Sequence, residues 1–171
     1  EVPAHKYADL SDNTKGAAIF TDCKYGFKIH ENIMEMNLLR SPTYPDPDAD
    51  IGKQKFTYSF YPHKHHFLNS DVINKSNEMN RLPLIYDNIK LDQPLKPLIK
   101  ILNKDISIEA IKKAEKENCY VIRLVEQFGK TCETGFELKD NYKLTETNLM
   151  EWEEFKTIKR DEKNSFKPFE I

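Results

Sequence analysis

The chain has 171 residues, of which 39% are hydrophobic and 32% are charged, and its formal net charge is -2. This length suits one domain with a single core. Lys and Arg are not in excess and do not gather on one stretch, which excludes a strongly basic nucleic-acid-binding protein. No apolar run approaches the roughly 18 to 20 residues of a membrane-spanning helix. We therefore expect a globular domain with no nucleic-acid and no membrane partner.

Three cysteines, Cys23, Cys119 and Cys132, leave at least one thiol unpaired, and no two of them form a C-x-x-C motif. Free thiols are typical of a reducing compartment, so the sequence predicts a cytoplasmic protein. The Lys, Asn and Ile content suggests a bacterial source with A·T-rich DNA. Because the chain opens with Glu1 and stops at Ile171 on an apolar rhythm, we expect both ends to continue in a longer protein.

Alternating apolar and polar residues, rich in β-branched and aromatic types, predict strands in the first part of the chain. Four such segments cover residues 16–22, 25–31, 33–40 and 55–63. The second and third are joined by a tight connection, Glu31-Asn32, in which Asn tolerates a positive φ. We expect these two strands to pair antiparallel.

The second part of the chain mixes one helix signal with further strand signals. Residues 70–80 carry apolar positions at helical spacing after a capping residue, which predicts a short helix. Residues 119–127, 131–139 and 143–153 alternate as strands do. Residues 106–117 have the composition of a helix, although a strand meander would absorb them as another strand.

Four stretches, in this order and spacing, resemble the C-terminal part of the α-mannosidases of glycoside hydrolase family 38, in the branch of cytosolic, vacuolar and bacterial enzymes. The first three lie within residues 1–63 and are dense, and the resemblance thins after Asn80. The stretches are EVPAHKYADLS (1–11), TDCKYGF (21–27), LLRSPTYPDPDADIGKQKFTYSFYPH (38–63) and VIRLVEQFG (121–129).

The resemblance implies a parent enzyme that hydrolyses terminal α-linked mannose with retention, using zinc and an Asp nucleophile. Retention needs two carboxyl groups about 5 to 5.5 Å apart. In the family both come from an N-terminal α/β domain, which these residues do not include, so we expect no catalytic residue, metal or cofactor here. The family's C-terminal half implies an all-β fold, a single antiparallel β-sandwich over residues 1–171 with one or two short helices. That fold favours a strand at residues 106–117.

The loop after residue 39 has a composition that suits a functional surface loop better than a packed element. Residues 41–52 hold three prolines and three aspartates, which suit neither a helix interior nor a strand ladder. In the enzymes it resembles, the corresponding loop leans toward the sugar site. We hypothesise that four residues shape or brace the mannose pocket: Arg40, Asp46, Asp48 and Asp50. The alternative is that Arg40 pairs with these aspartates merely to hold the loop.

Several other residues invite a chemical role but suit a structural one better. His63 matches the end of the family's YPH pattern and is expected to be hydrogen-bonded rather than a zinc ligand. Cys23 lacks a general base, so we expect it to be a buried structural residue. Asp22 and Tyr25 are expected to pin the strand turn, with Gly26 allowing close backbone approach.

The aromatic run FTYSFY places three rings, those of Phe56, Tyr58 and Phe60, on one face of a strand, and we expect that face to pack in the core. The resulting hypothesis is an accessory domain that supports the missing N-terminal catalytic domain, walls part of its pocket for a mannose-containing glycan, and is inactive alone. A stand-alone carbohydrate-binding module and a small interaction protein are the alternatives. A surface once covered by the catalytic domain predicts self-association.

Overall fold

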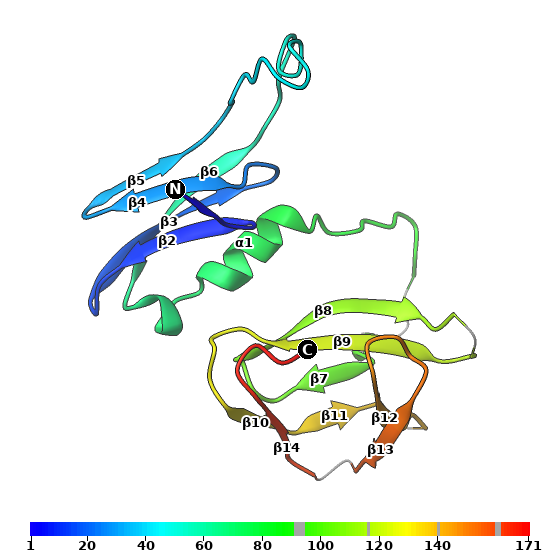
Figure 1. Ribbon diagram of the computed structural model, residues 1–171. Coiled ribbons are helices and arrows are strands. Elements are labelled where there is room, and N and C mark those ends of the chain that lie inside the picture. Colours follow the sequence, from blue (N-terminus) through cyan, green and yellow to red (C-terminus); the bar gives the residue numbers. More distant parts are fainter. Residues whose placement is uncertain (91–94, 116, 140, 160–161) are drawn as a thin grey trace. The chain divides into compact units, whose positions relative to one another are not determined.

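The structure is a computed structural model that describes residues 1–90, 95–115, 117–139, 141–159 and 162–171. The chain divides into two compact units, Glu1–Asp87 and Asn88–Ile171 (Figure 1). The sequence predicts one sandwich over residues 1–171, whereas the structure groups the strands into these two units. Antiparallel strands dominate both units and the helices are short, so the predicted all-β class is confirmed.

Unit 1 contains two three-stranded antiparallel sheets, of order β2-β3-β6 and β1-β4-β5. A 3-10 helix, η1 (Phe67–Asn69), and the helix α1 (Val72–Asn80) follow the last strand, so the predicted helix over residues 70–80 is confirmed. The strands are β1 (Val2–Pro3), β2 (Tyr7–Ser11), β3 (Lys15–Thr21), β4 (Gly26–His30), β5 (Ile33–Met36) and β6 (Tyr58–Lys64).

The predicted hairpin is confirmed, because β4 pairs antiparallel with β5 and His30 lies opposite Ile33. The residue with positive φ in its two-residue turn is Glu31, at 51°, where the sequence pointed to Asn32. The third predicted strand ends early, at Met36, and the fourth starts late, at Tyr58. Residues 37–40 and 55–57, which were expected in these strands, instead belong to the proline-rich loop between them.

The core of unit 1 forms where α1 covers one face of the β2-β3-β6 sheet. Ala18 and Phe20 from β3 and Val72 from α1 are buried, and four partly buried side chains pack around them: Tyr7, Tyr61, Phe67 and Met79. Burying this apolar surface is the main stabilising contribution to the unit.

Unit 2 is built from antiparallel strand pairs, namely β8-β9, β7-β11, β10-β14 and β12-β13. Among the residues of unit 2 that the structure describes, the buried apolar side chains are Ile99, Ile106 and Phe136. The strands are β7 (Ile99–Ile101), β8 (Ile106–Lys113), β9 (Tyr120–Glu126), β10 (Cys132–Thr134), β11 (Phe136–Leu138), β12 (Leu144–Thr147), β13 (Glu154–Ile158) and β14 (Asn164–Phe166).

The ambiguous segment is a strand over Ile106–Lys113, as the resemblance favours, and residue 116 lies outside the described residues. Its pairing with β9 overrides its helical composition, since Ile111 lies opposite Ile122. The strand predicted over residues 131–139 is interrupted at Gly135, so that β10 and β11 pair with different strands. Among the described residues, no helix has the length and apolar character needed to cross a membrane.

Candidate functional site

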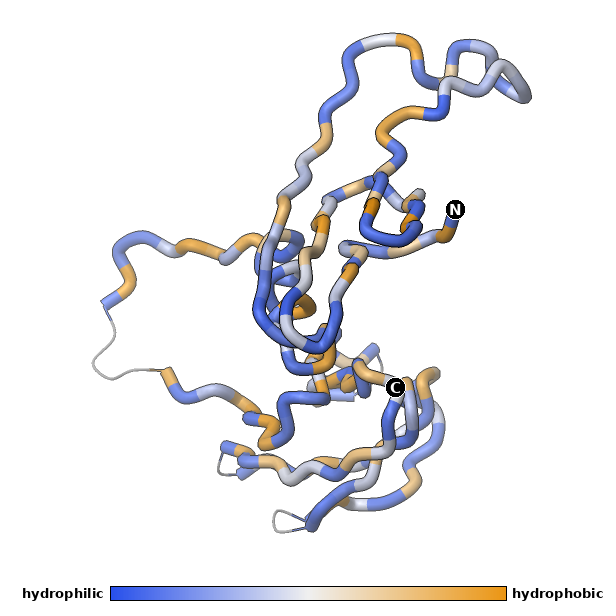
Figure 2. The backbone as a smooth tube through the Cα atoms, turned by 90° about the vertical axis from the view of Figure 1, so that its left-hand side faces the viewer, coloured by the Kyte–Doolittle hydropathy of each residue, from blue (hydrophilic) through white to orange (hydrophobic). Residues whose placement is uncertain are grey.

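The connection between β5 and β6 projects from the sheets of unit 1 as an arm, here residues 37–57 (Figure 1). Coloured by hydropathy, the backbone shows both hydrophobic and hydrophilic residues in unit 1 (Figure 2). Tyr44 is 86% exposed and Ile51 is 73% exposed. The arm therefore offers apolar as well as charged side chains at the surface.

The aspartates of the arm bind the arm's own backbone. Asp50 Oδ2 accepts a hydrogen bond from the Ser41 amide at 2.6 Å, and Asp46 Oδ1 accepts one from the Asp48 amide at 2.9 Å. The Asp48 carbonyl in turn accepts from the Ile51 amide at 3.0 Å. Such side-chain-to-backbone bonds are how Asp stabilises turns. Asp46 and Asp50 thus fix the shape of the arm rather than its attachment to the sheets.

Arg40 lies at the root of the arm with an exposed side chain. Across residues 1–90 and the other described ranges, its guanidinium makes no ion pair and no hydrogen bond, so the expected pairing of Arg40 with the arm aspartates does not occur there. Its five N–H donors remain available to a carboxylate or to sugar oxygens. Of the four predicted pocket residues, Arg40 is the one best placed to bind a ligand or another domain.

The connection between β3 and β4, together with the first residue of β4, holds both ends of the arm. Both carboxylate oxygens of Asp22 accept from the Thr57 amide, at 3.0 Å each, and the Asn37 amide donates to the Gly26 carbonyl at 2.9 Å. A Cβ on Gly26 would lie 3.2 Å from the Asn37 Cβ, so the backbone approach there is close. The Tyr25 ring stacks on His5 beside this connection, with centroids 5.3 Å apart.

Cys23 is exposed, so its expected burial is wrong. A hydrogen bond with Asp22, followed by partial loss of hydration, raises the pKa of the exposed Cys23 thiol. The same bond, followed by the Thr57 backbone, lowers the pKa of Asp22 from its ordinary 3.8 to about 2. A thiol held in its protonated form is a poor nucleophile. All three cysteines are free, as predicted.

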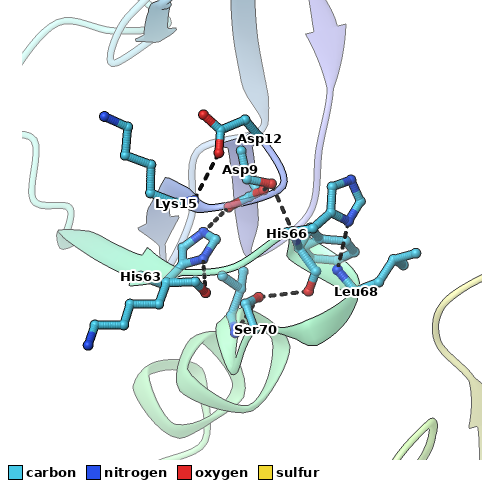
Figure 3. Close-up of polar contacts among 11 residues, drawn as sticks. Asp9, Asp12, Lys15, His63, His66, Leu68 and Ser70 are labelled. Carbon is cyan, nitrogen blue, oxygen red and sulfur yellow. Dashed lines mark hydrogen bonds and ion pairs between the residues drawn. The ribbon is translucent and has the colours of Figure 1, made fainter.

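His63 belongs to a buried polar cluster on the α1 side of the β2-β3-β6 sheet (Figure 3). Its Nε2 lies 2.6 Å from Asp9 Oδ2, and the two side chains are only 3% and 8% exposed. Ser11 Oγ donates to the other Asp9 oxygen at 2.7 Å and accepts from the Phe67 amide at 3.1 Å. A Cβ on Gly16 would overlap the His63 ring, so glycine makes room for the pair.

The neighbouring histidines have local roles. His66 precedes η1, and its Nδ1 accepts from the Leu68 amide at 3.3 Å (Figure 3). His65 is exposed. Within the described ranges, no three His, Cys, Asp or Glu side chains come together in a way that could hold a metal ion. These residues therefore do not fit the zinc ion that the resemblance implies for the parent enzyme.

The aromatic face of β6 points away from the core, so the predicted core face is wrong. Tyr58 is 60% exposed and Phe60 is 66% exposed, whereas Tyr61 on the opposite face stacks on Phe20 with centroids 5.3 Å apart. Alternation along the strand is as predicted, but α1 covers the Tyr61 side. The Phe56 ring stacks on Tyr58 at 6.5 Å, which extends the exposed aromatic surface toward the arm.

Glu126, a buried carboxylate of unit 2 that the sequence did not single out, binds several backbone amides. It is fully buried, and its oxygens accept from four backbone amides at 2.8–3.1 Å, those of Phe128, Gly129, Lys130 and Phe169. Burial by itself raises the pKa of its carboxyl group, but the hydrogen bonds from the four amides have the larger combined effect. The pKa of Glu126 is therefore lowered from its ordinary value. Glu126 thereby joins the loop after β9 to the end of the chain.

Neither Asp9 nor Glu126 could be assigned a role from local sequence. Asp9 lies in EVPAHKYADLS and Glu126 in VIRLVEQFG, so both stand in stretches that carry the resemblance. Their partners lie far away in the chain, since His63 is 54 residues from Asp9 and Phe169 is 43 residues from Glu126. The sequence signal that could have pointed to both residues is a charged side chain within an otherwise apolar strand. If such a side chain is buried, it must form hydrogen bonds with other groups of the protein.

Two family models match the chain, one in each unit. Residues 1–48 match the C-terminal domain of glycosyl hydrolases family 38, and residues 105–171 match the C-terminal beta sandwich domain of the same family. The first match includes β1 to β5 and the front of the arm. The second includes β8 to β14 and Glu126.

Curated relatives agree with both matches. The chain is 37% identical to "Alpha-mannosidase G" of Dictyostelium discoideum over 133 residues, which are 75% of this chain and 12% of that protein. It is 48% identical to the "Alpha-mannosidase" of Saccharomyces cerevisiae over 80 residues, 47% of this chain and 7% of that protein. It is 34% identical to the human "Alpha-mannosidase 2C1" over 134 residues, 75% of this chain and 13% of that protein.

These relatives come from a slime mould, a yeast and a mammal, so they give no support to the expected bacterial source. The chain spans about an eighth of the length of the Dictyostelium and human proteins that it matches. Since both family models describe the same C-terminal region and agree with the antiparallel β fold, the chain belongs to glycosyl hydrolase family 38, as part of its C-terminal region.

Proposed function

We propose that the chain is an accessory region of a cytoplasmic α-mannosidase that hydrolyses terminal α-linked mannose with retention. In this proposal the two catalytic carboxyl groups and a zinc ion belong to an N-terminal catalytic domain outside these residues, and the chain is inactive alone. The matches to family models and to relatives named α-mannosidases support it. The free cysteines agree with a reducing compartment.

The observation that carries the proposal is the exposed, self-braced arm with Arg40 at its root. Asp46 and Asp50 hold the arm's shape, while Arg40 keeps its donors for a partner. An ordered loop that projects from a rigid sheet is a common way to complete a binding site built mainly elsewhere. The arm would wall part of the mannose pocket, with Arg40 donating to a sugar oxygen or to a carboxylate of the catalytic domain.

Arg40→Ala in the complete enzyme tests the role of the arm. Loss of a hydrogen bond from a charged donor is worth about 1.5–3 kcal/mol, so kcat/KM for an aryl α-mannoside should fall at least roughly tenfold. Lys28→Ala is the matched control, since Lys28 is an exposed cation of the same unit whose ion pair with Glu35 is 3.0 Å long. Unchanged kcat and KM in Arg40→Ala would rule out a pocket role for the arm.

The accessory role is tested by assaying the 171-residue chain and the complete enzyme side by side, each supplied with zinc. Hydrolysis of the aryl α-mannoside by the complete enzyme alone is expected. Hydrolysis by the isolated chain would mean that its own carboxylates perform the reaction, and the proposal would be abandoned.

A second candidate function, carbohydrate binding without chemistry, is favoured by the exposed aromatic face of β6. Tyr58 and Phe60 stand on one face of the strand, and sugars stack their apolar C–H surfaces on such rings. Weak, saturable binding of methyl α-mannoside by the chain, lost in Phe60→Ala, is the expected result for this candidate. Phe155→Ala is the control, because Phe155 in unit 2 is 60% exposed, close to the 66% of Phe60.

The same exposed surface supports the proposed contact with the catalytic domain. Leu39, Tyr44 and Ile51 on the arm and Phe60 on β6 are 46–86% exposed, which is costly for a surface that stays in water. In the purified chain this surface should drive self-association. Light scattering coupled to size-exclusion chromatography would show a mass that rises with concentration, and a strictly monomeric chain at high concentration would contradict this part of the proposal.

A further inference from the structure

Unit 2 contains an open cleft of about 1050 Å³ that the proposed role of the arm does not use. It lies where β7 ends, where β10 passes into β11, and where β14 begins. A volume of this order is enough for a ligand of several sugar rings. The residues that carry the argument are Leu102, Asn103, Lys104, Glu133, Glu162 and Lys163.

Hydrogen bonds between the strands fix the walls of the cleft. The Asn103 amide donates to Thr134 Oγ1 at 3.2 Å, and Asn103 Nδ2 donates to the Glu133 carbonyl at 2.9 Å. The Leu102 amide donates to the Gly135 carbonyl at 3.2 Å. Because these bonds hold the end of β7 against the β10-β11 connection, a ligand would enter a cleft that is already formed, at little cost in ordering.

The charges in the cleft balance. Glu133 and Glu162 contribute two carboxylates, Lys104 and Lys163 contribute two ammonium groups, and none of these four forms an ion pair within the part of the chain that the structure describes. The remaining charged residue of the lining, Glu137, is paired with Lys100 at 3.2 Å. The lining alone holds three carboxylates and two ammonium groups, and Lys100, which lies outside the lining, neutralises the third carboxylate, that of Glu137. With the charges balanced in this way, the cleft attracts neither anions nor cations strongly.

We propose that this cleft is a second binding site for a neutral oligosaccharide. Carboxylates accept hydrogen bonds from hydroxyl groups and ammonium groups donate to them, while the 57% exposed side chain of Leu102 offers an apolar surface to the C–H face of a sugar ring. The assignment of the sugar as an α-mannoside rests on the proposed function. In the intact enzyme, such a site would hold a branched glycan through a part that is not being cleaved.

The test is a nuclear magnetic resonance titration of the 171-residue chain with an α-linked mannobiose. Amide shifts should move at Leu102, Asn103 and Lys104 and along β10, and saturate. Glu133→Ala and Glu162→Ala should each weaken binding roughly tenfold, as expected for a hydrogen bond to a charged group. Glu146→Ala on β12 is the matched control, and its affinity should equal that of the unchanged chain. Unchanged amide spectra elsewhere show that each variant is folded.

Each remaining outcome overturns the proposal. Absence of saturable binding removes the site, and binding that survives both cleft substitutions but is lost in Phe60→Ala moves it to the face of β6. Preference for inorganic phosphate over the mannobiose means that the cleft is an anion site. The proposed accessory role is tested by a different measurement, hydrolysis by the complete enzyme carrying Arg40→Ala. A negative result in the mannobiose titration therefore rejects the cleft site without rejecting the accessory role.

Discussion

Carboxylates organise two loops of this protein by accepting backbone N–H bonds, but the two loops differ in burial. In the arm, Asp50 binds the Ser41 amide nine residues away, near water. In unit 2, Glu126 is fully buried and reaches as far as Phe169, 43 residues away. Buried amides that lose their acceptor cannot turn to water, whereas exposed ones can.

This difference in burial and in sequence range indicates which part of the molecule each carboxylate stabilises. Glu126 holds together parts of unit 2 that are distant in the chain, so its loss should be felt in the stability of the whole unit. Asp50 shapes a projection that few other residues depend on, so its loss should be felt in the arm alone. Each prediction that follows tests this contrast, beginning with the largest expected effect.

Glu126→Ala should lower the free energy of unfolding of the chain by roughly 3 kcal/mol, because a fully buried carboxylate is removed and four backbone amides lose their shared acceptor at once. Chemical denaturation followed by circular dichroism measures it. Glu146→Ala, which removes an exposed carboxylate of the same unit, is the control and should change the value by less than about 0.5 kcal/mol. Equal effects of the two substitutions would show that burial of Glu126 is unimportant.

Gly129→Ala should cost about 1–2 kcal/mol, because Gly129 has φ of 69° and a Cβ there would lie 2.6 Å from the Phe169 ring. Phe169→Ala removes the steric part of this cost and leaves the backbone part. We therefore expect Gly129→Ala to be less destabilising in the Phe169→Ala background. A double-mutant cycle measured by denaturation gives the difference, and strict additivity would mean that the ring moves aside freely.

Acid should weaken unit 2 through Glu126. Its pKa is lowered in the folded state, so its ionisation stabilises the fold above the ordinary value of 4.5, and this contribution is lost as pH falls from there through the folded pKa. The unchanged chain should therefore lose more stability below pH 4.5 than Glu126→Gln does. Melting temperatures of the two across this range provide the measurement, and parallel curves would exclude Glu126 as the source.

Much of this fold could be predicted from periodicity and from the resemblance. The β4-β5 hairpin, α1 and the strand at Ile106–Lys113 follow from alternation, capping and resemblance. The face of β6 could not be predicted, because Phe60 and Tyr61 are both aromatic and the choice was made by α1, which packs later in the chain on the Tyr61 side. Periodicity gives two faces, and only tertiary contacts say which one is covered.

The candidate site shows the same limit. Composition singled out the arm and its four polar residues, but it could not show that Asp46 and Asp50 bind their own loop while Arg40 stays unengaged within the described residues. Those contacts depend on backbone geometry, including the positive φ of 50° at Ser41, which no residue pattern announces. Long-range partners such as Asp9 and His63 were hidden for the same reason.

Asp50→Ala should have the smallest effect on global stability, below about 0.5 kcal/mol, because the Ser41 amide that it releases can bind water. Its local effect should be clear. Hydrogen exchange at the Ser41 amide should accelerate in Asp50→Ala, while amides of β3 and β6 keep their protection, and Asp48→Ala should leave Ser41 unchanged. If Asp50→Ala instead destabilises unit 1 as a whole, the arm is an integral part of the fold, and the contrast with Glu126 no longer separates a functional projection from a structural anchor.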